Sequence, residues 1–335
     1  MRAIIPERYG RGIVRALVVS NMLPDAAHPE RGRFVRDQVA ALRRLEELEV
    51  ELYEFSPGGR ALAGAALDLR RRFAGRSPLD RRVRTQPWDV VHAHFGLTAW
   101  PALAVPARVR ALTVHGTDVR HPRTRLATGA VLPLIDLLAA VSAPLARELP
   151  GRAARHRAQV LPCGVDLERF RPLARAQARA ELGLHRDRPY LLFAADPSRP
   201  EKRHDLALAL ARAVEVELLT LGAVDPARVP LWINAANAVL VPSDREGFGL
   251  TVLEALACDV PVLATPVGIH PDALNGVEGT LCAPFDLAHW RAAVEPHLQT
   301  PDPRVEGRHS AERYSAEKMA GRVADAWRTA LKSSG

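Results

Sequence analysis

Cysteine and long apolar runs are scarce in this chain of 335 residues. An odd number of widely spaced thiols excludes an even disulfide framework, and no pair of them has metal-ligand spacing. The three are Cys163, Cys258 and Cys282. The longest apolar stretch, 131–141, is interrupted by Pro133 and Asp136 and is far shorter than the roughly 20 residues of a membrane-spanning helix. Residues 1–24 carry arginines throughout and have no apolar core typical of a signal peptide, so we expect a cytoplasmic protein with free thiols.

Lysine is also scarce, since only three of the 46 basic residues are lysine. The net charge of +8 comes from the first half: residues 1–170 hold 27 basic and 17 acidic side chains, whereas residues 171–335 hold 19 and 21. The densest basic run is Arg70–Arg72, Arg76, Arg81, Arg82 and Arg84. A solvated, arginine-rich face is the favoured interpretation. Two alternatives for this basic half are peripheral contact with the inner face of an anionic membrane and attraction of a phosphate-bearing acceptor. No aromatic residues interleave with the run, so no nucleic-acid partner is expected.

Short apolar runs alternate with helical segments twice along the chain. The expected strands are 14–19, 50–55, 90–94, 111–115, 137–141 and 160–162, and then 190–195, 216–221, 238–241 and 262–265. Strands separated by helix-length segments predict parallel α/β sheets. The sequence therefore predicts two Rossmann-like domains, residues 1–170 and 171–315, followed by a final helical segment, 316–335.

The turn after the first expected strand argues against a nicotinamide dehydrogenase. A dinucleotide-binding turn needs the pattern G-x-G-x-x-G, whose glycines let the main chain approach the pyrophosphate. Here the turn Ser20–Pro24 reads S-N-M-L-P and contains no glycine.

The segment 242–257 reads P-S-D-R-E-G-F-G-L-T-V-L-E-A-L-A and connects an expected strand to an expected helix. Gly247 and Gly249 let the main chain approach a ligand without an intervening side chain. The open amides of Gly249, Leu250 and Thr251 at the helix start form a site for a diphosphate, helped by the helix dipole.

Two acidic residues flank this loop. Glu246 precedes the glycines and can reach the hydroxyls of a sugar beyond the diphosphate. Glu254 lies about one turn into the helix and can reach a ribose. A structural alternative exists for each, because Thr251 and Glu254 have the spacing of a capping box and Glu246 suits a solvated loop. Both acids together, around G-F-G between a strand and a helix, favour a nucleotide-sugar site.

This segment resembles the E-x7-E signature of the family-4 retaining glycosyltransferases, which have the GT-B fold. The resemblance implies that Glu246 contacts the donor sugar and that Glu254 binds the ribose. It also assigns Gly247, Phe248, Gly249, Leu250 and Thr251 to the donor site. The implied architecture is two Rossmann-like domains facing each other across a cleft, with the C-terminal helix crossing back to the first domain.

Other segments extend the resemblance over nearly the whole chain. Residues 161–170, L-P-C-G-V-D-L-E-R-F, are similar to the family's N-G-V-D-x-x-x-F junction, with Cys163 in place of asparagine. Residues 32–38, 89–94 and 115–118 are similar to landmarks of the first domain. The resemblance implies donor contacts for Gly32 and His115, and acceptor-side positions for Arg33, Phe34, His94 and Asp118.

A lysine and an arginine are expected to face the diphosphate. Lys202 matches the family's lysine in E-K-G, but the usual G-R five residues earlier is replaced by Asp196 and Pro197. Arg199 is the nearby arginine of the same loop that can substitute. Two cations here would neutralise the departing nucleoside diphosphate as a metal does elsewhere, and no D-x-D pair occurs, so no metal cofactor is expected. His92 and His94 share one side of a strand but lack a third ligand nearby.

The resemblance implies retaining transfer of a sugar from a nucleoside-diphosphate sugar, with a UDP-sugar favoured, to a saccharide, lipid-linked or small-molecule acceptor. The leaving phosphate would accept the acceptor's proton on the front face, so no side chain need be a general base. The segment between 221 and 239 is shorter than usual in the family, which leaves the nucleobase open. The alternative is a non-catalytic nucleotide-sugar-binding protein with a degenerate site.

Overall fold

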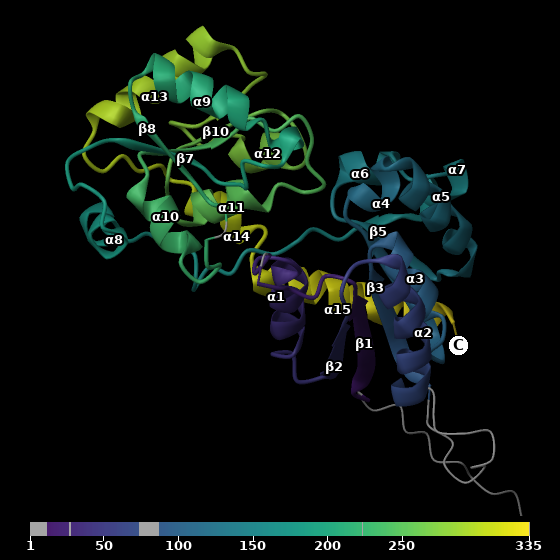
Figure 1. Ribbon diagram of the computed structural model, residues 1–335. Helices are drawn as coiled ribbons and strands as arrows, with labels where there is room; N and C mark the ends of the chain where they lie inside the picture. Colours follow the sequence, from purple (N-terminus) through teal and green to yellow (C-terminus); the bar gives the residue numbers. More distant parts are fainter. Residues whose placement is uncertain (1–11, 27, 74–86, 223, 335) are drawn as a thin grey trace, which may run out of the picture.

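The computed structural model describes residues 12–26, 28–73, 87–222 and 224–334. Four members of the densest basic run, Arg76, Arg81, Arg82 and Arg84, therefore lie outside the described residues. Two lobes are visible in Figure 1, and the C-terminal helix α15 (Ala316–Ser333), drawn in yellow, lies against the lobe formed by the first half of the chain. The expected α/β architecture with two parallel sheets is confirmed.

The first lobe contains a parallel sheet of six described strands in the order β2-β1-β3-β4-β5-β6. The strands are β1 (Val14–Ser20), β2 (Leu48–Glu54), β3 (Trp88–His94), β4 (Ala107–Val114), β5 (Leu137–Ala140) and β6 (Gln159–Val160). The helices are α1 (Arg33–Leu42), α2 (Gly59–Phe73), α3 (Gly96–Ala102), α4 (Thr117–Arg120), α5 (Pro122–Val131), η1 (Leu132–Leu134), α6 (Ala143–Arg147) and α7 (Arg152–Arg157). Central strands such as β1 are buried on both faces, as a parallel sheet covered by helices requires.

The second lobe contains five described strands in the order β11-β10-β9-β7-β8. The strands are β7 (Tyr190–Phe193), β8 (Glu217–Thr220), β9 (Ala238–Val241), β10 (Val262–Ala264) and β11 (Leu281–Cys282). The helices are α8 (Arg175–Leu182), η2 (Pro200–Lys202), α9 (His204–Ala213), α10 (Val229–Ala235), α11 (Leu250–Ala257), α12 (His270–Leu274), α13 (Leu287–Gln299) and α14 (Arg308–Glu312). Only β11, a strand of two residues, was absent from the predicted set.

The strand register brings the functional loops together. In the first sheet Ser20 pairs with His94 and His94 with Thr113, so the loops after β1, β3 and β4 share one edge. In the second sheet Phe193 pairs with Leu240, and Val241 with Ala264, so the loops after β7, β9 and β10 share another. Ligands of open α/β sheets bind at these carboxyl ends.

Helix α15 returns to the first lobe and completes its core. Met319, Val323 and Trp327 are buried against Val35 and Val39 of α1. At the crossing, Val165 N–H donates to Tyr314 O, and Ala316 N–H donates to Val165 O, both at 2.9 Å. Gly164 allows this close approach, because a Cβ there would lie 2.8 Å from the Cα of Ala316. The expected return of the C-terminal helix is present.

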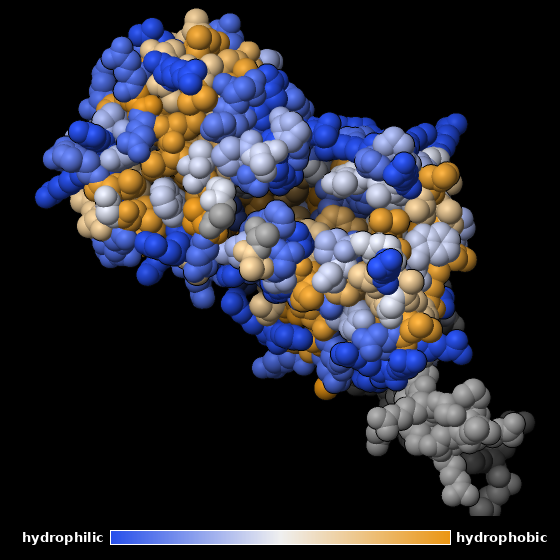
Figure 2. All heavy atoms as spheres, in the orientation of Figure 1, coloured by the Kyte–Doolittle hydropathy of each residue, from blue (hydrophilic) through white to orange (hydrophobic). Residues whose placement is uncertain are grey.

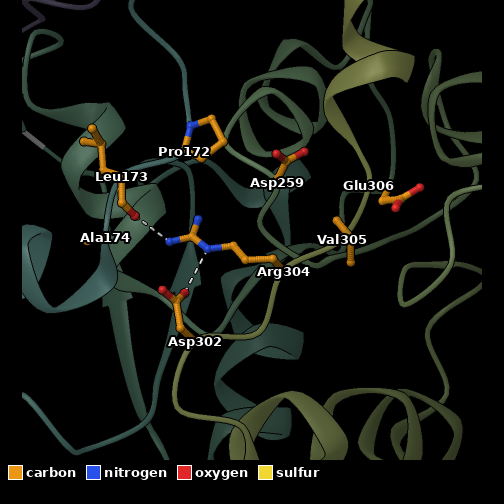
Figure 3. A pocket seen from close by; sticks show the side chains of 8 residues that line it. All are labelled: Pro172, Leu173, Ala174, Asp259, Asp302, Arg304, Val305 and Glu306. Atoms are coloured by element: carbon orange, nitrogen blue, oxygen red, sulfur yellow. Dashed lines mark hydrogen bonds and ion pairs between the residues drawn. The ribbon is translucent and has the colours of Figure 1, made fainter.

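Arginines fasten the segments that connect the lobes. Arg308 donates to the main-chain oxygens of Leu167, Phe170 and Ala257 at 2.8–3.0 Å. Arg304 donates to Leu173 O at 2.6 Å and to Asp302 at 2.8 Å, beside a hollow of about 490 Å³ (Figure 3). Because this guanidinium is engaged with its own surroundings, we regard the hollow as part of the linker. No helix among the described residues is long and apolar enough to cross a bilayer.

Candidate active site

A cavity of about 740 Å³ lies between the lobes, where the space-filling view is hollowed (Figure 2). Both lobes contribute to its wall. From the first come Met22, Phe34, Phe95, His115, Gly116, Thr117, Arg120, His121, Pro122, Val141 and Cys163. From the second come Arg199, Glu201, Lys202, Arg245, Glu246, Gly247, Phe248, Gly249, Leu250 and Thr251. The cavity thus joins the predicted diphosphate loop with the predicted sugar-binding histidine.

The loop between β9 and α11 has the geometry expected of an anion site. Helix α11 begins at Leu250, and Gly249 precedes it with φ of +107°, a conformation that favours glycine. No side chain caps the helix start, so its first amides are left for a ligand. The capping-box alternative is wrong for the described structure, because neither Thr251 nor Glu254 makes a capping hydrogen bond.

Each glycine of the loop makes a close approach. A Cβ on Gly247 would collide with the main-chain oxygen of His115 from the opposite lobe. A Cβ on Gly249 would lie 2.5 Å from Nε2 of His270, a buried ring behind the loop. The first contact brings the lobes together and the second supports the loop from within its own lobe.

Glu246 is held by a cation from the neighbouring loop. Its Oε1 accepts from Lys202 Nζ at 2.5 Å and from the Ser243 hydroxyl at 2.8 Å. Burial pushes the pKa of Glu246 upward, but the charge and hydrogen bond of Lys202 outweigh it and leave the pKa below its ordinary value. The carboxylate is therefore ionised at neutral pH and is not a free solvated loop acid.

Arg199 lies on the cavity wall but is engaged by its own loop. Its guanidinium pairs with Glu201 at 2.7 Å, and 55% of its side chain is exposed. Lys202 is far more enclosed, with 12% of the side chain exposed. Of the two cations predicted to face the diphosphate, Lys202 is the one fixed beside Glu246.

Glu254 faces a cluster of charges at the junction of the lobes. Burial raises its pKa to about 7, and Arg169 opposes this shift. Arg169 itself pairs with Asp37 of α1 at 2.7 Å. Glu254 makes no hydrogen bond or ion pair with any described residue, and it does not line the cavity of about 740 Å³. Its carboxylate is therefore left without a hydrogen bond from the described residues, which suits a group that binds a ligand.

The first-lobe residues predicted for the site divide into two sets. Phe34 and His115 line the cavity with their rings 4.8 Å apart. Gly32 and Arg33 do not line it: Gly32 packs against Met22 O with φ of +69°, and Arg33 pairs with Asp37 at 3.1 Å. Gly32 and Arg33 therefore shape the start of α1 and leave the cavity wall to Met22 and Phe34.

His94 and Asp118 are buried behind the wall, so the acceptor-side position expected for them is not where the structure has them. His94 has no exposed surface and contacts His115. The Asp118 carboxylate accepts from the main-chain amides of His115, Gly116 and Gly96 at 2.7–3.3 Å. Burial raises the pKa of Asp118 to about 6. The Asp118 carboxylate therefore stabilises the turn that carries His115.

Two residues that join the lobes were not predicted. Arg120 donates to Glu246 O at 3.1 Å while its guanidinium pairs with Glu148 at 2.7 Å. Ser142 donates its hydroxyl to Gly247 O at 2.7 Å. The signal for Arg120 was available, because it follows Asp118 by two residues in the turn after a strand. Ser142 carries no such signal.

No group of three or more His, Cys, Asp or Glu side chains within the described ranges is arranged to hold a metal ion. His92 has both ring nitrogens engaged, by the Trp327 indole at 3.1 Å and the Thr113 hydroxyl at 2.7 Å. Among the residues described, His92 and His94 are therefore buried side chains of the core and are not arranged as metal ligands.

Two facing α/β lobes, with an uncapped helix start at the cleft between them, define a GT-B transferase. The model of Glycosyltransferase Family 4 matches residues 31–169, and that of Glycosyl transferases group 1 matches residues 176–300. The D-inositol 3-phosphate glycosyltransferase of Thermobispora bispora is 31% identical over 307 residues, covering 73% of this chain and 71% of that protein. The protein of the same name from Frankia alni is 32% identical over 273 residues, covering 64% and 66%. The chain belongs to the family-4 glycosyltransferases.

Solved structures with the same fold are more distant in sequence. Sucrose-phosphate synthase from Thermosynechococcus elongatus is 19% identical, with a TM-score of 0.69 over 96% of this chain and 100% of that one. Anabaena HepE in complex with UDP-glucose is 16% identical, with a TM-score of 0.64 over 94% and 99%. The catalytic domain of Arabidopsis starch synthase IV, bound to ADP and acarbose, is 12% identical, with a TM-score of 0.68 over 96% and 100%. These likenesses establish the GT-B fold.

Proposed function

We propose that the protein transfers a sugar from a nucleoside-diphosphate sugar to an acceptor bound in the same cleft, with retention of anomeric configuration. The observation that carries this proposal is the uncapped start of α11 beside the Lys202–Glu246 pair, in a cavity shared by both lobes. Amides at a helix start and a lysine suit the diphosphate, and an ionised carboxylate suits sugar hydroxyls. HepE in complex with UDP-glucose and starch synthase IV bound to ADP share this fold.

In this proposal the donor spans the loop from one side to the other. The diphosphate binds the amides of Gly249–Thr251 and Lys202, the sugar lies between Glu246 and His115, and the ribose reaches Glu254. A UDP-sugar is favoured. Glu254 makes no hydrogen bond or ion pair with a described residue, although the charge of Arg169 acts on it, which supports its availability to the ribose.

His115 and Glu246, the two wall side chains expected beside the sugar, are poorly suited to act as a general base, which supports a front-face mechanism assisted by the leaving phosphate. Burial lowers the pKa of His115 to about 3, so its ring does not take up a proton near neutral pH. Glu246 is committed to Lys202 and Ser243. The catalytic contribution is then positioning and stabilisation of the leaving group by Lys202 and the helix start, without a metal cofactor.

A phosphate-bearing acceptor is the favoured choice among the saccharide, lipid-linked and small-molecule acceptors. The relatives are named for D-inositol 3-phosphate. On the cavity wall Arg245 is exposed and makes no ion pair with a described residue, while Arg120 and Lys202 are paired. An unpaired guanidinium suits a phosphate group.

The test is release of nucleoside diphosphate from a panel of UDP-, GDP- and ADP-sugars, each with phosphorylated and unphosphorylated polyol acceptors, in excess chelator. We expect turnover in chelator, an α-configured donor giving an α-configured product by NMR, and loss of turnover in Glu246→Gln. Glu312→Gln, an exposed carboxyl on α14, is the matched control. Turnover that disappears in chelator would contradict the metal-free mechanism, and unchanged turnover in Glu246→Gln would contradict the site.

A non-catalytic nucleotide-sugar-binding protein is the second candidate, because the family's G-R is replaced by Asp196 and Pro197 and Arg199 is engaged by Glu201. Donor binding without turnover against the whole acceptor panel would favour it.

We also propose peripheral contact of the first lobe with an anionic membrane. Trp100 of α3 and Leu126 of α5 are 39% and 78% exposed, and Leu67 of α2 is 60% exposed. Helix α3 contacts both α2 and α5, and α2 ends in Arg70–Arg72. Apolar side chains beside a cationic helix end suit an anionic lipid surface. Co-sedimentation with phosphatidylglycerol vesicles, absent with phosphatidylcholine and reduced in Leu126→Ser, is the expected result.

A further inference from the structure

The histidine on the cavity wall is joined to a second, fully buried histidine. Nε2 of His115 lies 2.9 Å from Nδ1 of His94, and the two rings stack at 5.1 Å with an interplanar angle of 29°. Burial lowers the pKa of His115 to about 3 and that of His94 well below its ordinary value. Both rings are therefore neutral, and each carries one N–H.

A bond between two neutral imidazoles needs one donor and one acceptor. Either His94 donates through Nδ1–H, or His115 donates through Nε2–H. In the first arrangement the remaining proton of His115 lies on Nδ1. In the second, Nδ1 of His115 carries a lone pair. This nitrogen has no partner among the described residues, and it belongs to a ring on the cavity wall. The direction of one buried bond thus decides whether the ring offers a donor or an acceptor to a ligand.

Gln38 of α1 selects between the two arrangements. Its side-chain amide nitrogen lies 3.5 Å from Nε2 of His94, and its side chain is buried. An amide nitrogen only donates, so Nε2 of His94 accepts. His94 then carries its proton on Nδ1 and donates to His115, which leaves the His115 proton on Nδ1. The opposite orientation of the Gln38 amide would reverse the direction of both hydrogen bonds, from Gln38 to His94 and from His94 to His115.

The His92 ring stacks on the His94 ring, but the two residues belong to separate sets of hydrogen bonds. The Trp327 indole donates to Nδ1 of His92, so His92 carries its proton on Nε2 and donates to the Thr113 hydroxyl. The His92 and His94 rings lie 4.8 Å apart at 19°, with no hydrogen bond between them. Trp327 and Thr113 therefore fix the ring on which His94 rests, without changing the tautomer of His94.

We infer that Gln38 and His94 are positioning residues, which hold His115 as the Nδ1–H tautomer so that its ring donates to an oxygen of the sugar bound in the cleft. The sugar contact rests on the proposed function, whereas the tautomer is a property of the free protein. A sugar oxygen that can accept from Nδ1–H is then selected over a substituent that can only donate or that is apolar.

The first experiment is long-range ¹H–¹⁵N NMR of the full chain labelled in histidine, without nucleotide or sugar. His115 is assigned by comparison with His115→Asn. We expect His115 to be protonated on Nδ1 and His92 on Nε2 at neutral pH. Protonation of His115 on Nε2 in the wild-type protein would overturn the inference, whatever the outcome for transferase activity.

The second experiment reverses the direction of the hydrogen bonds that join Gln38, His94 and His115. In Gln38→Glu the carboxylate accepts from His94 Nε2–H, so His115 must donate through Nε2 and expose a bare Nδ1. In Gln38→Met, a substitution of similar length that is easier to bury, the selection is removed and intermediate ¹⁵N shifts are expected. Gln299→Glu, at an exposed helix end, is the matched control. A His115 tautomer unchanged in both Gln38 variants would overturn the inference.

Kinetics then link the tautomer to the donor. Loss of one hydrogen bond predicts about a tenfold fall in kcat/KM for Gln38→Glu, and the same fall is expected for a donor deoxygenated at the contacted position with the wild-type protein. The variant should not lower activity further on that deoxygenated donor. A separate, additive loss would show that Gln38 acts only through stability. If the tautomer is as inferred and no donor is turned over, the proposed function fails and the tautomer assignment stands.

Discussion

Ser142 of the first lobe donates its hydroxyl to the main-chain oxygen of Gly247 in the second lobe, at 2.7 Å. Arg120 makes a parallel contact with Glu246 O at 3.1 Å. Both bonds reach the main chain of the loop that carries the predicted sugar-binding carboxylate. The lobes are therefore closed on one another at this loop, and the position of Glu246 depends on that closure.

Gly247→Ala is expected to prevent this closure. The new Cβ would collide with His115 O, which is main chain and cannot rotate away, while the backbone at 247 needs no positive φ. We expect kcat to fall at least about tenfold, because misplacing a catalytic group by an ångström has effects of that size or larger. Thermal unfolding should change little, and small-angle scattering should show a larger radius of gyration.

Gly321→Ala on α15 is the control for this substitution, because a Cβ there meets open space. An unchanged kcat and radius of gyration in Gly247→Ala would mean that the contact between the lobes is not used in turnover.

Donor binding is expected to depend on pH through Glu254. Burial raises its pKa to about 7, above the ordinary 4.5, and only the ionised carboxylate accepts two ribose hydroxyls. Raising the pH from 6 to 8 takes the group from mostly protonated to mostly ionised, so the donor Kd should fall by about tenfold. The same group contributes folding stability that is complete below pH 4.5 and lost as the pH rises through 7.

Isothermal titration with the donor at pH 6, 7 and 8 measures this dependence, and Glu254→Gln should abolish it. The variant is needed because burial raises the pKa of Asp118 to about 6, and that group titrates in a neighbouring range. A donor Kd that is flat between pH 6 and 8 in the wild-type protein would contradict the assignment of Glu254.

The loop from Glu246 to Thr251 could be predicted from sequence because its chemistry is local. Two glycines between a short apolar strand and an apolar helix dictate the turn, and α11 begins at Leu250, as the pattern indicated. The central strands were also predictable, since buried parallel strands read as short apolar runs. Strand β11 was missed because two residues carry no periodicity.

The contacts between the lobes could not be predicted, because they depend on how two separately folded lobes dock. His94 illustrates the limit. Its place in the H-x-H pattern marks the end of β3, but only the register against β4 shows that its ring turns inward to His115 and not to the cleft. Asp118 likewise reads as a site acid, and its burial under three main-chain amides becomes visible only in the folded turn.

The C-terminal helix should contribute strongly to the stability of the first lobe. Trp327 is fully buried against α1 and β3, so Trp327→Ala should lower the free energy of unfolding by about 3–5 kcal/mol. Trp327→Phe keeps most of the packing but leaves His92 Nδ1 without its donor, which should cost about 1–3 kcal/mol. Urea unfolding measures both, with the partly exposed Trp100→Phe as control. Equal stability of Trp327→Phe and the wild type would mean that the indole bond contributes nothing.

Replacing one partner of the Lys202–Glu246 pair should lower the free energy of unfolding more than replacing both. Their side chains are 12% and 10% exposed, so Lys202→Met leaves a carboxylate that burial disfavours, and a loss of about 3–5 kcal/mol in the free energy of unfolding is expected. Without the lysine, burial should raise the pKa of Glu246, and the variant should lose further stability as the pH rises through that value. Replacing both, in Lys202→Met with Glu246→Gln, should recover part of the loss. Arg199→Met breaks a pair with an arginine that is 55% exposed and should cost less than about 1 kcal/mol. Urea unfolding of the wild type, Lys202→Met, Glu246→Gln and the double variant gives a double-mutant cycle, and additive losses for Lys202 and Glu246 would show that the two charges are not coupled.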